Sequence, residues 1–71
     1  MKEFRINAVN GHYDVSYYYN NELKNRNNYE LVEILCRLNG LAKDGCDFDI
    51  NISGDEIEAD LLSYWIDEFG I

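Results

Sequence analysis

An Asn-Gly step between two alternating segments constrains the fold of this chain more than any other sequence feature. Asn10-Gly11 separates residues 2–9 from residues 12–19. A type I′ turn at this step needs a positive φ at both central residues, which Asn and Gly tolerate. Apolar and polar side chains alternate in both segments, and pairing about this turn places the two apolar sets on one face. We therefore predict a β-hairpin with strands at residues 2–9 and 12–19.

The two faces of this hairpin differ in chemistry. The apolar face is expected to carry Phe4, Ile6, Ala8, Tyr13, Val15, Tyr17 and Tyr19, and the other face Glu3, Arg5, Asn7, Asp14, Ser16 and Tyr18. Tyr18 is then the outward member of the tyrosine run. An aromatic side chain among acids suits a protein interface better than an RNA-stacking platform. Cross-strand packing is the simpler interpretation of Tyr18.

The middle of the chain is expected to form a loop followed by a helix. Residues 20–28 are polar and rich in asparagine, which is typical of a loop. Asn27 followed by Glu30 predicts a helix start of the capping-box kind. The next apolar residues, Leu31, Ile34, Leu35, Leu38 and Leu41, recur at helical spacing. Asn39-Gly40 can end this helix; alternatively it continues to Lys43 and stops at Gly45.

A strand and a second helix complete the pattern. Residues 47–52 alternate cleanly, with Phe48, Ile50 and Ile52 on one side, which predicts a half-buried strand. Ser53 with Glu56 three residues later predicts a capping box, and a helix is expected to follow as far as about Phe69. Its inward side chains are expected to be Ile57, Leu61, Leu62, Trp65 and Phe69.

The element order ββαβα predicts an α+β fold formed by a single domain over residues 1–71. Two amphipathic helices are available to cover one face of a three-stranded sheet, which gives a two-layer structure. A right-handed crossover would make the third strand parallel to the second. Placing the third strand beside the first then makes every neighbouring pair antiparallel, with the strand order 2-1-3.

Composition favours a folded cytoplasmic protein. Hydrophobic residues make up 46% of the chain and aromatic residues 14%, which is enough for a core. No apolar run approaches the ~20 residues needed to span a bilayer, and the N-terminal residues have no apolar segment typical of a signal peptide. We expect Cys36 and Cys46 to remain reduced in a reducing compartment.

The residues that carry catalysis or bind metals are poorly represented. His12, the single histidine, is expected at the edge of a turn, no second histidine lies near Ser16, Ser53 or Ser63, and the carboxylates are expected to be exposed. Cys36 and Cys46 do not have zinc-knuckle spacing. Residues 47–58 echo the spacing of a calcium loop, but Ile52 occupies the position that requires glycine. We therefore expect no enzymatic activity, no cofactor and no metal.

Charge is distributed very unevenly along the chain. All six basic residues lie in the first 43 positions, which carry a net charge of +1. The remainder holds nine acidic residues and no Lys or Arg, so its charge of −9 exceeds the whole net charge of −8. Such a protein should repel nucleic acid and anionic membranes, and its expected partners are basic surfaces.

The acids of the second helix are only partly explained by the helix itself. Acids in the first turn are favoured by the helix dipole, whereas Asp67 and Glu68 lie at the unfavourable end and have no base at i+4. Glu56, Asp60 and Asp67 follow one outer face over about 16 Å. One DNA strand places roughly five phosphates in that length. The alternative is that these acids only keep the protein soluble.

These features predict a small acidic protein that binds and inhibits another protein stoichiometrically. The carboxylates would occupy a basic surface that binds nucleic acid, in the manner of phage anti-defence proteins such as anti-CRISPR proteins and DNA mimics. Two alternatives remain open: an immunity protein or antitoxin that neutralises a cognate toxin, and a structural or oligomerising module. The expected partner-binding residues are Glu56, Asp60, Asp67 and Glu68 on the helix and Asp47, Asp49, Asp14 and Tyr18 on the sheet.

Overall fold

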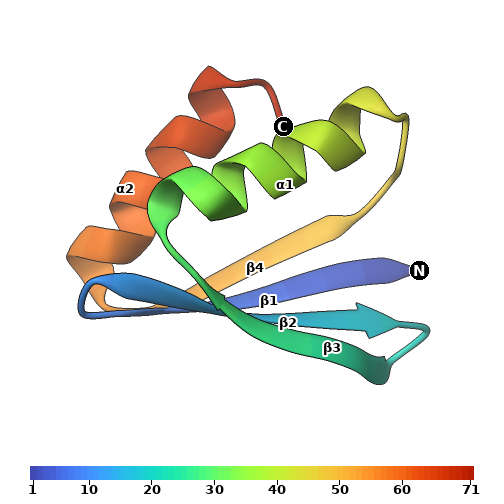
Figure 1. Cartoon of the computed structure of the whole chain (residues 1–71), viewed down its shortest axis with the longest axis horizontal. Coiled ribbons are helices and arrows are strands. Elements are labelled where there is room, and N and C mark those ends of the chain that lie inside the picture. The colour runs from blue at the N-terminus through green and yellow to red at the C-terminus, as the bar shows by residue number, and fades with distance from the viewer.

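The computed structural model describes residues 1–71 as two helices packed on one face of a four-stranded sheet (Figure 1). The elements in chain order are β1 (Lys2–Val9), β2 (His12–Tyr19), β3 (Glu22–Tyr29), α1 (Leu31–Lys43), β4 (Asp49–Gly54) and α2 (Glu56–Glu68). The strands lie in the order β3-β2-β1-β4. The α+β class is as predicted, whereas the three-stranded sheet and the order ββαβα are wrong because one strand was missed.

The first hairpin forms in the predicted register. Val9 pairs with His12 across the turn and Ile6 pairs with Val15, so the two apolar sets share the face beneath the helices. Gly11 has a φ of +87°, whereas Asn10 does not have a positive φ. A type I′ turn needs both, so the predicted pairing is confirmed and the predicted turn type is wrong.

Residues 20–28, predicted as a loop, instead form a second turn and most of β3. Asn20 and Asn21 have φ values of +51° and +65°. Positive φ at both central residues is the pattern of a type I′ turn, and Asn tolerates it better than most residues. Asn25 and Asn27 lie on the core-facing side of β3, and both are polar and exposed. The strand therefore lacks the apolar alternation by which a strand is recognised in sequence.

The missed strand also explains a wrong strand direction. β4 lies beside β1, as predicted, but it is parallel to β1, with Ile50 opposite Phe4 and Ile52 opposite Ile6. β3 is antiparallel to β2 and therefore runs in the same direction as β1. A crossover through α1 returns the chain in the direction of β3, so the pair β1–β4 must be parallel.

Both helices begin at caps other than those predicted. Glu30 and Glu33 form a reciprocal capping box at the start of α1, in place of the Asn27 cap. This helix continues through Gly40 to Lys43, and Gly45 follows with a φ of +80°, so the longer alternative is confirmed. At α2 the Asp55 carboxylate accepts a 3.0 Å hydrogen bond from the backbone N–H of Glu58. Ser53 belongs to β4 and is not the cap.

The core lies between the sheet and the two helices. Its nine buried residues are Ile6, Ala8, Tyr13, Val15, Ile34, Leu35, Leu38, Leu62 and Ile66. α2 contributes only Leu62 and Ile66, because it packs mainly on β4 and β1 and approaches α1 only slightly. Four of the five side chains predicted to face inward from α2 are therefore exposed: Ile57, Leu61, Trp65 and Phe69.

Candidate interaction surface

The four acids predicted on the second helix are exposed on α2. Glu56 lies in its first turn and Asp60 one turn later, while Asp67 and Glu68 lie in the last turn, which contains no base. Because α2 packs against the edge strand β4, it lies at one border of the domain. At 100° per residue, Glu56, Asp60 and Asp67 share one side of the helix, which is called the acidic side of α2 below, whereas Glu68 lies around the axis at the angle of Ile57 and Leu61.

None of the acids in the second part of the chain is neutralised by an ion pair. The molecule contains two salt bridges, Arg5–Glu3 at 3.1 Å and Lys24–Glu22 at 3.4 Å, and both join residues of the first 43. Every carboxylate from Asp44 onward therefore lacks a cationic partner within ion-pair distance. Exposed acids without partners repel one another and leave their full charge available to a basic surface.

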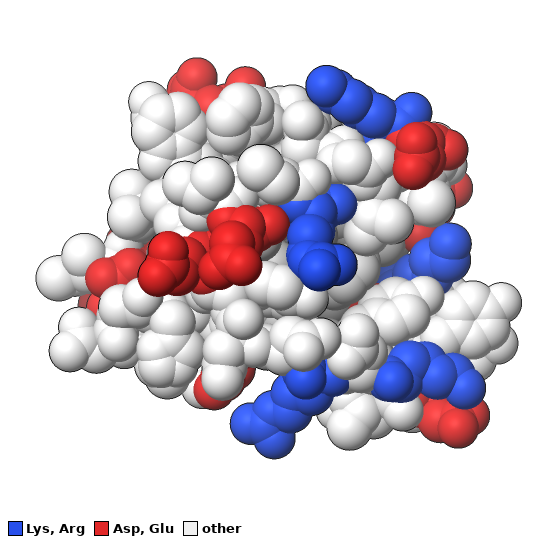
Figure 2. Space-filling model, viewed as in Figure 1, with Lys and Arg blue, Asp and Glu red and all other residues white.

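The order of the strands turns the uneven charge of the sequence into a spatial separation. β3 carries Lys24 and Arg26 and forms one edge of the sheet, while β4 forms the opposite edge. Neither β4 nor α2 contains Lys or Arg. In Figure 2 no basic side chain appears over the left third of the molecule, where Figure 1 places α2. The protein is therefore polarised from a basic edge to an acidic edge.

The candidate residues of the sheet are divided between two places. Asp47 and Asp49 are exposed immediately before and at the start of β4, on the same border as α2. Asp14 lies on β2, half-buried and level with Asn7 and Asn28 on the neighbouring strands. Asp47 and Asp49 therefore do not form one patch with Asp14, which lies two strands away.

Tyr18 lies on the open face of the sheet beside Glu3, as predicted, but a base covers it. The guanidinium carbon of Arg5 lies 4.0 Å from the centre of the Tyr18 ring, a cation–π contact. Arg5 also donates a hydrogen bond to Glu3, which raises the pKa of Arg5 and lowers that of Glu3. The open face is therefore mixed in charge, and the expectation of an acid-lined face around Tyr18 is wrong.

Sequence reasoning missed an exposed apolar stripe on α2. It consists of Ile57, Leu61, Tyr64, Trp65 and Phe69, whose exposures range from 37% for Trp65 to 78% for Ile57. Trp65 contacts two other aromatic rings, with centroid distances of 5.2 Å to Tyr64 and 5.9 Å to Phe69. The helical spacing of Ile57, Leu61, Trp65 and Phe69 predicts a buried face, which is wrong, and the sequence pattern gives no signal for Tyr64. We call these five residues the apolar stripe.

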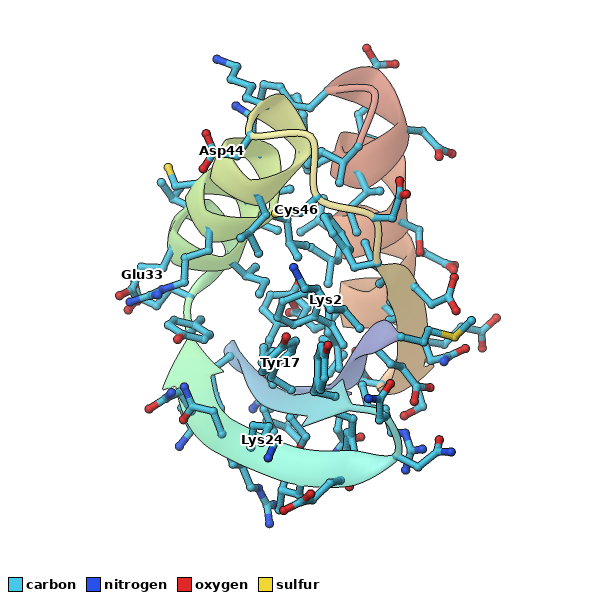
Figure 3. The ribbon with its side chains drawn as sticks, turned by 90° about the vertical axis from the view of Figure 1, so that its right-hand side faces the viewer. Lys2, Tyr17, Lys24, Glu33, Asp44 and Cys46 are labelled. Carbon is cyan, nitrogen blue, oxygen red and sulfur yellow. The ribbon has the colours of Figure 1, made fainter.

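A groove of about 480 Å³ lies between α1 and the sheet. Val15 and Tyr17 contribute to its sheet side, Leu38 and Leu41 to its helix side, and Lys2 also lines it. In Figure 3 the Lys2 side chain rises from the sheet into the space between Tyr17 and Cys46. Two of the inward residues of β3, Asn25 and Asn27, are short and polar and leave space open under α1, whereas Tyr29 packs against the core.

The spacing that echoes a calcium loop falls largely on an extended strand. Residues 49–54 form β4, so their carboxylate and amide side chains alternate across the sheet and do not surround one point. No group of three or more His, Cys, Asp or Glu residues is placed to share a metal ion. Cys36 and Cys46 are free thiols.

Comparison with known proteins does not place the chain in a family. No protein-family model matches the chain, and neither a curated protein nor a solved structure is significantly similar to it. Neither helix has the length and apolar character needed to cross a membrane.

Proposed function

We propose that this protein binds another protein stoichiometrically and inhibits it by occupying a basic surface with the acidic side of α2. The observation that carries the proposal is that no carboxylate after residue 43 has a cationic partner within the molecule. Charged surfaces of one sign increase association rates and select partners of the opposite sign. The partner surface is expected to be one that normally binds nucleic acid.

The spacing of the acids supports a nucleic-acid-binding partner. Glu56, Asp60 and Asp67 are all exposed and follow α2 over about 16 Å. A groove that binds a phosphate strand presents positive charge over such a length. Carboxylates fixed on a helix would then occupy positions normally taken by phosphates, and nucleic acid would compete with the protein for the same surface.

The same surface supports an immunity protein or antitoxin as the second candidate. In that case the partner is one cognate toxin with a basic active surface, and the electrostatic argument is unchanged. The two functions differ in whether the partner is a nucleic-acid-processing protein of a host or a toxin. Identifying the captured protein separates them.

Affinity capture with charge variants tests the proposal. The immobilised protein should retain a basic, nucleic-acid-processing protein from a host lysate, and DNA or increasing salt should release it. Asp60→Lys should weaken this capture, and the double variant Asp60→Lys/Asp67→Lys should abolish it. Glu22→Lys is the control, because it makes the same charge change as Asp60→Lys on the opposite edge of the sheet.

The control decides between a local surface and a general effect of net charge. Circular dichroism should show that all the variants remain folded. If Asp60→Lys and Glu22→Lys reduce capture equally, or if neither does, the acidic side of α2 is not the binding surface and the proposal is wrong.

A further inference from the structure

α2 presents three different surfaces around its axis. Leu62 and Ile66 face the core, Glu56, Asp60 and Asp67 face solvent as a row of acids, and the apolar stripe lies between these two sides. At 100° per residue, Ile57, Leu61 and Trp65 lie on one side of the helix at successive i, i+4 positions. A helix with an exposed apolar side directly beside an acidic one presents two recognition elements to one partner.

The composition of the apolar stripe is typical of a binding centre. Trp and Tyr are enriched among the residues that contribute most to binding energy. Trp65 contacts both Tyr64 and Phe69, and the three rings form an exposed aromatic cluster on a 71-residue protein. Exposed apolar patches of this kind on small proteins mark interaction sites.

Charge identifies what covers the apolar stripe. A second copy docked α2 to α2 would bring its own acids against those of the first, because α2 contains no base. A head-to-tail contact through β3 would offer only Arg26 and Lys24, which is already paired with Glu22, against the repulsion between two chains of net charge −8. Like charges brought together at an interface are destabilising. A partner with Lys and Arg beside its apolar residues would instead neutralise the acids while it covers the stripe.

We propose that the apolar stripe is the anchor of the interface and that it receives an amphipathic helix of the partner, with Lys or Arg residues bordering its apolar face. This inference rests on the proposed function and adds the form of the partner surface. Ile57 and Phe69 are separated by about 18 Å along α2. A partner helix of roughly three to four turns therefore covers the whole stripe.

Synthetic peptides test the chemistry of the partner directly. The first probe is an amphipathic helical peptide of about 18 residues built from Leu and Lys, long enough for helix formation to be supported on binding. The second probe replaces Lys with Glu, and the third is a scrambled Leu-Lys sequence with the same composition but without an apolar face. Trp65 is the only tryptophan, so its fluorescence reports whether the stripe is covered.

The Leu-Lys amphipathic peptide should bind and shift Trp65 emission to shorter wavelength, because the indole moves from water into an apolar contact. Affinity should fall as salt increases. The Leu-Glu peptide should not bind, and the scrambled peptide should bind at least about tenfold more weakly because it cannot bury the stripe. Equal binding of the scrambled and amphipathic Leu-Lys peptides would overturn the anchor role.

Two variants separate the stripe from the acids. Ile57→Ala/Tyr64→Ala removes the most exposed aliphatic and aromatic members of the stripe and keeps Trp65 as reporter; peptide affinity should fall about tenfold. Val32→Ala is the matched control, because Val32 is 71% exposed but lies on α1. If the stripe double variant behaves like the control, the inference is wrong. In that case the proposed function still stands if Asp60→Lys weakens capture of the partner from the lysate and the stripe double variant does not.

The oligomeric state provides an independent check. Light scattering should give the mass of a single chain at micromolar concentration and physiological salt, since two acidic α2 helices repel each other. A stable dimer that dissociates in the Ile57→Ala/Tyr64→Ala variant would show that a second copy covers the stripe, and would overturn the assignment of a basic helix.

Discussion

Gly54 ends β4 with a φ of +100°, at a point where β4 and β1 approach closely. A Cβ atom here would lie 2.8 Å from the backbone nitrogen of Ala8 and would overlap the carbonyl oxygen of Ala8. That carbonyl accepts a 2.7 Å hydrogen bond from the N–H of Asp55, the residue that caps α2. Gly54 thus permits the close contact from which α2 starts.

Gly54→Ala should lower the free energy of unfolding by about 3 kcal/mol or more, because it combines a strained φ with a backbone overlap. Gly11→Ala is the control: its φ of +87° is also positive, but a Cβ atom at Gly11 would have no neighbouring atom within 4 Å. It should cost only about 1–2 kcal/mol. Urea unfolding measures both; equal losses would show that the overlap at Gly54 relaxes without cost.

Tyr13 is buried in the core, and its hydroxyl donates to the carbonyl oxygen of Glu58 at 2.9 Å. Burial, and then the nearby Glu58 carboxylate, raise the pKa of Tyr13 to about 12 from its ordinary 10.0. The folded protein therefore holds this proton at a pH where the unfolded chain has begun to lose it. The contribution to stability is complete below about pH 10 and is lost as pH rises from about 10 to about 12.

Tyr13→Phe should remove this part of the pH dependence. At about pH 7 the variant should lose about 1 kcal/mol with the hydrogen bond. Between about pH 10 and 12 the wild type should lose more stability than the variant, so the two should converge. Urea unfolding at about pH 8 and about pH 11 makes the comparison, and a constant difference between the two proteins would contradict the assigned pKa direction.

At the scale of the element, α2 carries acids at both ends although the helix dipole favours them at only one. Glu56 lies in the first turn, and Asp67 and Glu68 lie in the last turn, where no base offsets them. Such terminal charges each change stability by about 0.3–1 kcal/mol. The charges of Asp67 and Glu68 therefore destabilise the last turn of α2.

Glu68→Lys should stabilise the protein by about 0.3–1 kcal/mol, whereas Glu56→Lys should destabilise it by a similar amount. The two variants have the same net charge, so thermal unfolding at low salt isolates the effect of position. Under the proposed function both should weaken partner binding. A Glu68→Lys variant that is more stable and binds less well would show that these acids are retained for binding.

At the scale of the whole molecule, the net charge of −8 acts within extents of only 29 × 24 × 16 Å. The Debye length is about 30 Å at 0.01 M salt, so all the unpaired carboxylates repel one another across the domain at that salt concentration. It falls to about 8 Å at 0.15 M, where mainly neighbouring charges still interact.

The melting temperature should therefore rise between about 10 mM and about 150 mM NaCl, because salt screens repulsion that is stronger in the compact state. The Asp60→Lys/Asp67→Lys variant carries less net negative charge and should show a smaller rise. Calorimetry at several salt concentrations provides the measurement. A melting temperature that is independent of salt would mean that the acids do not repel one another appreciably in the folded state.

Local patterns predicted the elements whose inward residues are apolar. The hairpin of β1 and β2, the strand around Ile50 and Ile52, and both helices were predictable because their apolar side chains alternate or recur at regular spacing. β3 was not predictable in this way, because its inward positions include Asn25 and Asn27, polar residues that line an open groove beneath α1 and are not buried. The exposed positions of Glu56, Asp60, Asp67 and Glu68 were predicted, whereas four members of the apolar stripe, Ile57, Leu61, Trp65 and Phe69, were wrongly predicted to face the core.

The sequence by itself determined the charge of each segment, the two helices and the first hairpin, since these depend on residues close together in the chain. Tertiary structure decided the direction of β4 and the exposure of Ile57, Leu61 and Trp65. Both depend on which surfaces meet: β3 reverses the chain before α1, and α2 rests mainly on β4 and β1, which leaves Ile57, Leu61 and Trp65 exposed. An apolar helical face becomes core only where another element covers it, and the sequence of α2 does not specify whether one does.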